Sequence, residues 1–177
     1  MLPSNERIKL SKNFFLDEFL NPVLYGNLIK DRYLYWQNLA NTDIDRFYKE
    51  FLNGDKLKKL VSIAQFIRDK YAKPVTINNW AKGGDRINSG VRDLNCSIGA
   101  PYSAHKKWEA IDMIVEGISE SKIYKDVLSD QYNFMSVGVT EIENGTWNNA
   151  TGEGWTHLSI RKTGLPSIKI IPYWVKK

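Results

Sequence analysis

The chain contains only two histidines among its 177 residues, and the surroundings of both suggest chemistry. His105 is followed seven residues later by Asp112, which lies inside the apolar run 110–115. Such a run, rich in β-branched residues, is typical of a buried strand, where an ionised carboxylate is costly unless it is paired or binds a metal. His157 lies in a second strand-like run, 155–161. Two imidazoles and one carboxylate form a common catalytic zinc set that leaves a fourth position open for water.

The segment that begins at Ser103 resembles the S-x-H-x-x-G-x-A-x-D signature of the zinc D-Ala-D-Ala carboxypeptidase family, which shares its fold with the Hedgehog signalling domain. Four positions match the signature, namely Ser103, His105, Ala110 and Asp112. The glycine of the signature would fall at Lys107 or Trp108, and neither is glycine. The alternative to zinc is that the two histidines make ordinary hydrogen bonds and that backbone donors satisfy a buried Asp112.

The resemblance implies roles for further residues. His157 resembles the last zinc ligand of the family, and the segment 89–92 resembles an S-G-x-R segment whose arginine, here Arg92, binds a substrate carboxylate. A planar guanidinium suits bidentate recognition of a carboxylate. Arg86 is a second candidate that no motif supports, and a solvated loop position is the simpler expectation for it. Ser103 is expected to donate a hydrogen bond to the substrate, to orient a ligand or to cap the turn that follows it.

Peptide hydrolysis at such a centre also needs a base. The resemblance implies a glutamate or aspartate a few residues before the last histidine, but the usual gap of three residues falls on Gly154. Glu153 is therefore the first choice, brought to the metal by a loop or bulge, although it could equally be an ordinary loop carboxylate. Glu141 and Glu143 rank lower, because strand alternation through 135–140 assigns both to the apolar face.

The elements that must position these residues follow from hydrophobic periodicity. Helices are expected at residues 11–20, 43–52, 55–71 and 123–128, a mixture of loop and helix at 21–41, and strands at 75–78, 110–115, 135–140, 155–161 and 167–175. Because side chains alternate between strand faces, Asp112 and His157 should share a polar face, with large apolar side chains on the other. The predicted fold is α+β, with helices on one face of a small, mainly antiparallel sheet and an open zinc cleft on the other, as in the Hedgehog/DD-peptidase fold.

The composition is that of one globular domain over residues 1–177, with the helical and loop segment 1–53 packed on it. No apolar run is long enough for a membrane span, and the first residues lack the pattern of a secretory signal, so synthesis in the cytoplasm is expected. The single cysteine, Cys96, excludes an internal disulfide and is expected to pack. The net charge of +5 permits attraction to an anionic cell wall, but the scattered basic residues do not favour nucleic acid.

Two functions compete. The first is a zinc peptidase that hydrolyses a bond in peptidoglycan stem peptides or cross-links, as a carboxypeptidase or an endopeptidase, in the manner of a phage endolysin. The second is a non-catalytic structural or wall-binding virion protein of the same fold. The missing signature glycine, Gly154, and Ser159 where many relatives carry an acid favour the second. The complete triad favours the enzyme, because structural zinc usually has four protein ligands.

Overall fold

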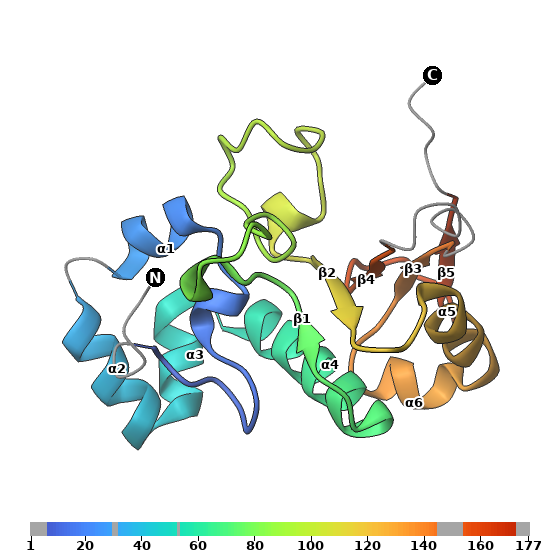
Figure 1. Ribbon diagram of the computed structural model, residues 1–177, viewed down its shortest axis with the longest axis horizontal. Coiled ribbons are helices and arrows are strands. Elements are labelled where there is room, and N and C mark those ends of the chain that lie inside the picture. Colours follow the sequence, from blue (N-terminus) through green and yellow to red (C-terminus); the bar gives the residue numbers. More distant parts are fainter. Residues whose placement is uncertain (1–6, 30–31, 53, 145–153, 173–177) are drawn as a thin grey trace.

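The computed structural model describes residues 7–29, 32–52, 54–144 and 154–172, and Figure 1 shows how its elements are arranged. Five strands of the described part form one sheet in the order β1-β2-β4-β3-β5. The strands are β1 (Val75–Thr76), β2 (Ala110–Val115), β3 (Glu141–Glu143), β4 (Thr156–Ser159) and β5 (Lys169–Ile171). Neighbouring strands are antiparallel except β3 and β5, which are parallel. The predicted α+β class is confirmed, and the one parallel pair makes the sheet mixed.

Six α-helices accompany the sheet in the same residue ranges. They are α1 (Pro22–Ile29), α2 (Tyr33–Thr42), α3 (Ile44–Leu52), α4 (Asp55–Tyr71), α5 (Glu120–Ser129) and α6 (Gln131–Ser136). Helix α4 coincides with the helix predicted at 55–71, because its apolar side chains recur at helical spacing and are buried. It ends at Ala72, which has a left-handed φ of 50°, ahead of Pro74. In Figure 1, α4 runs below β1 and β2, and α1–α3 gather at the end away from β3–β5.

The N-terminal segment contains more helix than predicted at 21–41, where α1 and α2 form, and less at 11–20, where only a 3-10 turn, Leu16–Glu18, is present. Aromatic packing accounts for the longer helices. The ring of Trp36 on α2 packs edge to face against that of Phe47 on α3, with 6.0 Å between the ring centroids. Both side chains belong to the same buried apolar cluster as the inward-facing residues of β2.

The prediction of a strand at 135–140 is wrong. Helix α6 continues into this segment, and a turn follows at Gly138, whose φ is 104°. Strand β3 begins only afterwards, and its Ile142 is fully buried in the core. Because side chains alternate along a strand, Glu141 and Glu143 project from the opposite face. The alternation inferred through 135–140 therefore assigned both glutamates to the wrong face of the sheet.

The other predicted elements are present with shifted ends. Strand β2 matches the run 110–115, whereas β1, β4 and β5 are shorter than predicted. Helix α5 begins before the predicted 123–128, because the hydroxyl of Ser119 accepts a hydrogen bond from the backbone N–H of Lys122 and caps it. Across the described ranges, no helix is both long and apolar enough to cross a membrane.

Candidate metal centre

Three elements bring His105, Asp112 and His157 together. Asp112 on β2 and His157 on β4 are directly paired residues of the antiparallel ladder, so their side chains share one face as predicted. His105 comes from a 3-10 turn, η4 (His105–Lys107), that leads into β2. One ligand atom from each of the three side chains lies within 4.8 Å of the other two. The faces inferred from strand alternation are confirmed at this pair.

The spacing of the three ligand atoms fits a metal ion. Nδ1 of His157 lies 2.7 Å from Oδ1 of Asp112, and Nε2 of His105 lies 3.3 Å from both of these atoms. In a tetrahedral zinc site with bonds of about 2.0–2.1 Å, neighbouring ligand atoms are roughly 3.3 Å apart. His105 is 4% exposed and Asp112 is 8% exposed, so these donors are shielded from bulk water. Two of the three distances match this spacing, the third is that of the hydrogen bond between His157 and Asp112, and the donor set is one that zinc accepts.

A backbone carbonyl next to Nδ1 of His105 determines which nitrogen of this ring faces the site. Nδ1 lies 2.8 Å from the carbonyl oxygen of Gly90, which only accepts, so Nδ1 carries a proton and Nε2 is the nitrogen left to bind a metal. The backbone N–H of Arg92 in turn donates to the carbonyl of His105. A Cβ at position 90 would lie 2.1 Å from the carbonyl oxygen of Phe19. Only glycine fits there. The segment 89–92, called the brace below, thus holds His105 in position through the carbonyl of Gly90.

The electrostatics of the pair on β2 and β4 favour an ionised carboxylate. Burial opposes ionisation of Asp112, but the charge of His105 and hydrogen bonds with both histidines outweigh it and hold the pKa of Asp112 well below its usual range. For His157, burial lowers the pKa, but the hydrogen bond with Asp112 and its negative charge raise it by more. Asp112 is therefore an anion ready to bind a cation, and metal binding must displace a proton held between it and His157.

The corrected position of β3 puts Glu143 on the same face of the sheet as His157. Glu141 pairs with Ser159 and Ile142 with Leu158, so the next residue, Glu143, comes level with His157 on the same face. Burial raises the pKa of Glu143, an effect opposed by the charges of both histidines and increased by that of Asp112. A half-buried carboxyl with a raised pKa, close enough to respond to the triad, suits a general base.

Sequence reasoning ranked Glu143 below Glu153, which lies outside the described residues. The signal that could have identified Glu143 is Gly138, because a glycine can end the predicted strand, after which the alternation of side chains between the two faces starts anew. At Gly154, where the resemblance implies an acid, an added Cβ would lie 2.3 Å from Oε2 of Glu120, the first residue of α5. Glu120 is therefore a second carboxylate close to the position at which an acid was expected.

Arg92 lies beside the triad. Its Nε donates to the carbonyl of Asn88 at 2.6 Å, and Nη2 is 3.7 Å from Oδ2 of Asp112, with the side chain 10% exposed. Burial lowers the pKa of this guanidinium, with the charge of Asp112 opposing the change. Arg86, expected on a solvated loop, instead bonds to the backbone: Nε donates to the carbonyl of Ile77 and Nη2 to that of Asp112. Arg86 thus ties its loop to the backbone of Ile77 and Asp112, whereas Arg92 lies beside the carboxylate of Asp112.

Ser103 begins the turn that carries His105. Its backbone N–H donates to the carbonyl of Ala100, and its own carbonyl accepts from the N–H of Lys106. The backbone of Ser103 therefore forms part of the turn, and a role for its hydroxyl in substrate or ligand orientation stays a prediction.

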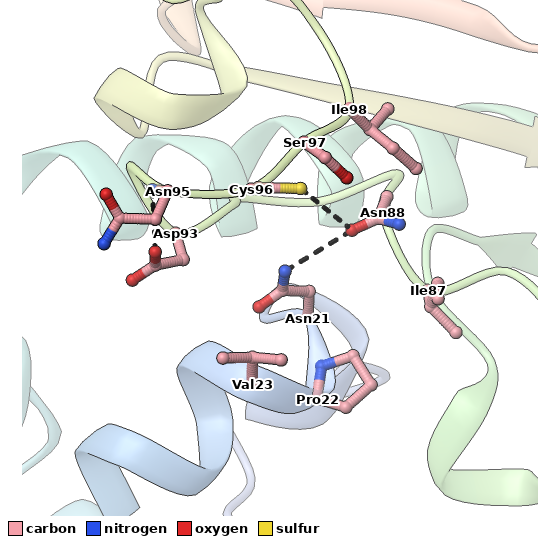
Figure 2. Close-up of a pocket in the computed structure, with 10 residues that line it drawn as sticks. All are labelled: Asn21, Pro22, Val23, Ile87, Asn88, Asp93, Asn95, Cys96, Ser97 and Ile98. Atoms are coloured by element: carbon pink, nitrogen blue, oxygen red, sulfur yellow. Dashed lines mark hydrogen bonds between the residues drawn. The ribbon is translucent and has the colours of Figure 1, made fainter.

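A pocket of about 460 Å³ lies between the start of α1 and the loop 93–98 (Figure 2). Figure 2 shows the amide of Asn88 contacting Asn21 and the thiol of Cys96, with Cys96 Sγ 3.7 Å from Asn88 Oδ1. Cys96 is a free thiol and half-buried, so it lines this pocket instead of packing in the core as expected. It is not among the candidate ligands of the metal centre.

Comparisons with known proteins add no further identification: no protein-family model matches the chain, and neither a curated protein nor a solved structure matches it.

Proposed function

We propose that this protein is a zinc-dependent peptidase that hydrolyses a peptide bond in the stem peptides or cross-links of peptidoglycan. The observation that carries the proposal is the convergence of His105 Nε2, Asp112 Oδ1 and His157 Nδ1 within 3.3 Å of one another. Three protein ligands leave one position for reacting groups, as in catalytic zinc sites. Zinc held there supplies Lewis acidity that polarises the scissile carbonyl and acidifies the attacking water.

The other side chains of the cleft have complementary roles. Glu143 accepts the proton of the attacking water and returns it to the amine that leaves when the C–N bond breaks. Arg92 binds the substrate carboxylate through its terminal nitrogens, because its Nε is already engaged by Asn88. Ser103, at the start of the turn that carries His105, is assigned to orienting the substrate or a ligand.

The conformation of Trp108 supports the family resemblance from which the substrate is inferred. Counted from Ser103, the signature glycine falls at Trp108, and this residue has a φ of 61°, in the left-handed region that glycine adopts most easily. The N–H of Trp108 donates to the carbonyl of His105, and that of Glu109 donates to the carbonyl of Ala104. The chain thus has the turn for which a glycine is suited, although the residue differs.

The competing function is a non-catalytic structural or wall-binding virion protein. It is favoured by Gly154, which provides no acid where the resemblance implies one. Because Glu120 lies against this position, an acid could not be accommodated there without moving its carboxylate. On this view the triad binds a metal that only stabilises the fold.

Incubation with purified peptidoglycan tests the proposal. The zinc-loaded wild type should release fragments, detected by mass spectrometry, and His157→Ala should release none. A carboxypeptidase would release single terminal amino acids, whereas an endopeptidase would open cross-links and leave a new amine and a new carboxylate. A wild-type protein that holds zinc and releases nothing from any wall preparation would support the non-catalytic function instead.

A further inference from the structure

A basic pocket lies next to the metal centre. Its volume is about 490 Å³, and its lining consists of five cationic side chains, one carboxylate and one apolar residue: Lys56, Lys59, Lys107, Arg161, Lys162, Glu109 and Ile160. The lining comes from the first turns of α4, from η4 and from the residues on either side of the β2–β4 pair. The sequence showed only scattered basic residues, and the fold gathers these five at one place.

The positive charge of this pocket is only partly compensated. Glu109 contacts two of the cations, with Oε1 2.8 Å from Lys56 Nζ and Oε2 3.7 Å from Arg161 Nε. The remaining cations, Lys59, Lys107 and Lys162, are exposed at the surface. Uncompensated charges around a concave surface raise the local concentration of an anion.

The pocket and the metal centre share two segments of the chain. Lys107 is the last residue of the turn that begins with His105, and Arg161 follows β4, which carries His157. The N–H of Ile160 donates to the carbonyl of Glu109, so the two segments that line the pocket are also paired with each other. A polymer bound here would therefore hold the cleft close to the surface to which that polymer is attached.

We infer that this pocket binds a phosphodiester polymer of the bacterial cell wall, of the alditol-phosphate kind, and so anchors the enzyme on its substrate. The choice of the wall as the source rests on the proposed function. Lysine ammonium groups suit repeated phosphates as point charges. Binding of single-stranded nucleic acid usually adds a series of aromatic platforms for base stacking. None of the seven lining residues is aromatic, and the exposed Tyr102, whose ring lies 5.5 Å from Lys107 Nζ, is a single ring beside them.

Co-sedimentation with cell walls tests this anchor. The proteins are the wild type, a pocket variant (Lys59→Ala, Lys107→Ala and Lys162→Ala combined) and a control variant with the same loss of charge at exposed lysines outside the pocket (Lys12→Ala, Lys73→Ala and Lys125→Ala combined). The walls are used before and after chemical removal of their phosphodiester polymer. We expect the affinity to fall roughly tenfold when either the polymer or the pocket lysines are removed, and to fall steeply with salt.

Several results would overturn the inference. Equal retention of the wild type on stripped walls would exclude the polymer, and an equal loss in the control variant would reduce the effect to net charge. Competition by duplex DNA as strong as that by soluble alditol-phosphate polymer would assign the pocket to nucleic acid instead.

The test separates the anchor from the chemistry. Binding is measured with His157→Ala in parallel, so it does not depend on hydrolysis. Hydrolysis of a soluble stem peptide by the pocket variant should equal that of the wild type, with the loss confined to intact walls. If no protein hydrolyses the peptide, the proposed function fails while the binding result stands.

Discussion

The two glutamates of β3 lie on one face but differ in their surroundings. Glu141 is 1% exposed, and its Oε1 lies 3.3 Å from the ammonium of Lys169, so it is enclosed and paired. Glu143 is half-buried, comes level with His157 and has a pKa that burial raises. A carboxyl that is reachable by solvent and by the reacting groups is the better proton acceptor. At the scale of single residues, Glu143 is therefore the base that we propose.

Replacing Glu143 by glutamine should leave zinc content and folding unchanged, because the amide keeps the size of the carboxylate. Loss of the proton acceptor should lower hydrolysis of wall peptides by about 10²–10⁴-fold. Initial rates for Glu143→Gln, Glu120→Gln and Glu153→Gln, each with its zinc content measured, make the comparison. Full activity in Glu143→Gln together with a large loss in one of the other two would transfer the role of base to that residue.

At the scale of elements, the centre depends on how closely the brace 89–92 approaches the N-terminal segment. The carbonyl of Phe19 accepts a hydrogen bond from the backbone N–H of Val91 at 2.7 Å. Gly90 lies against that carbonyl and also holds Nδ1 of His105. The turn at Trp108 then directs the chain from His105 into β2.

Gly90→Ala should therefore destabilise the fold and weaken zinc binding together. The added Cβ must displace backbone, an overpacking that typically costs about 1–3 kcal/mol, and its displacement moves the acceptor of His105. Denaturant unfolding and a zinc titration would measure the two effects. Gly26→Ala in α1 is the matched control, because nothing lies within 4 Å of its Cβ, and it should be neutral or stabilising. A Gly90→Ala protein as stable as that control would show that the close approach is unimportant.

The strain at Trp108 can be separated from its packing. Trp108→Gly and Trp108→Ala lose the same contacts with the core, but only alanine keeps the penalty of a left-handed backbone. The glycine variant should be more stable than the alanine variant by about 1–2 kcal/mol. Thermal unfolding of the two proteins side by side gives the difference. Equal stabilities would mean that the turn relaxes when the indole is removed.

The sequence predicted α4 and β2 with both of their ends, and the shared face of Asp112 and His157, because each depends on a local hydrophobic period. It failed where tertiary packing decides. The aromatic contact of Trp36 that supports α2 is made with the following helix, α3, and no pattern within α2 alone shows it. The turn at Gly138 breaks the apparent alternation through 135–140, so the residues of β3 lie on the opposite faces from those predicted. For that reason Glu143 was ranked too low as a candidate base, whereas the shared face of Asp112 and His157 did not depend on that turn.

At the scale of the whole molecule, the metal would join three parts of the fold that are otherwise held by one ladder and one turn. The proposed ligands come from η4, β2 and β4, and the brace beside them contacts the N-terminal segment. An ion that binds only the folded state stabilises it by mass action, by about 2.7 kcal/mol at a hundredfold excess over its dissociation constant.

Chelation should therefore lower the melting temperature by roughly 5–10 °C, given that about 1 kcal/mol shifts a protein of this size by 2–4 °C. Differential scanning calorimetry with zinc and with a chelator would measure the shift. His157→Ala is the control and should melt at the same temperature in both conditions. A chelator effect of equal size in that variant would place the stabilising ion elsewhere.

The zinc content of the protein tests the central claim most directly. Elemental analysis of wild type and His157→Ala, purified in parallel without added metal, should find one zinc ion per wild-type chain and little in the variant. Retention of a full equivalent of zinc by His157→Ala, or its absence from a wild-type protein that has been given zinc, would contradict the assignment of His105, Asp112 and His157 as the metal ligands.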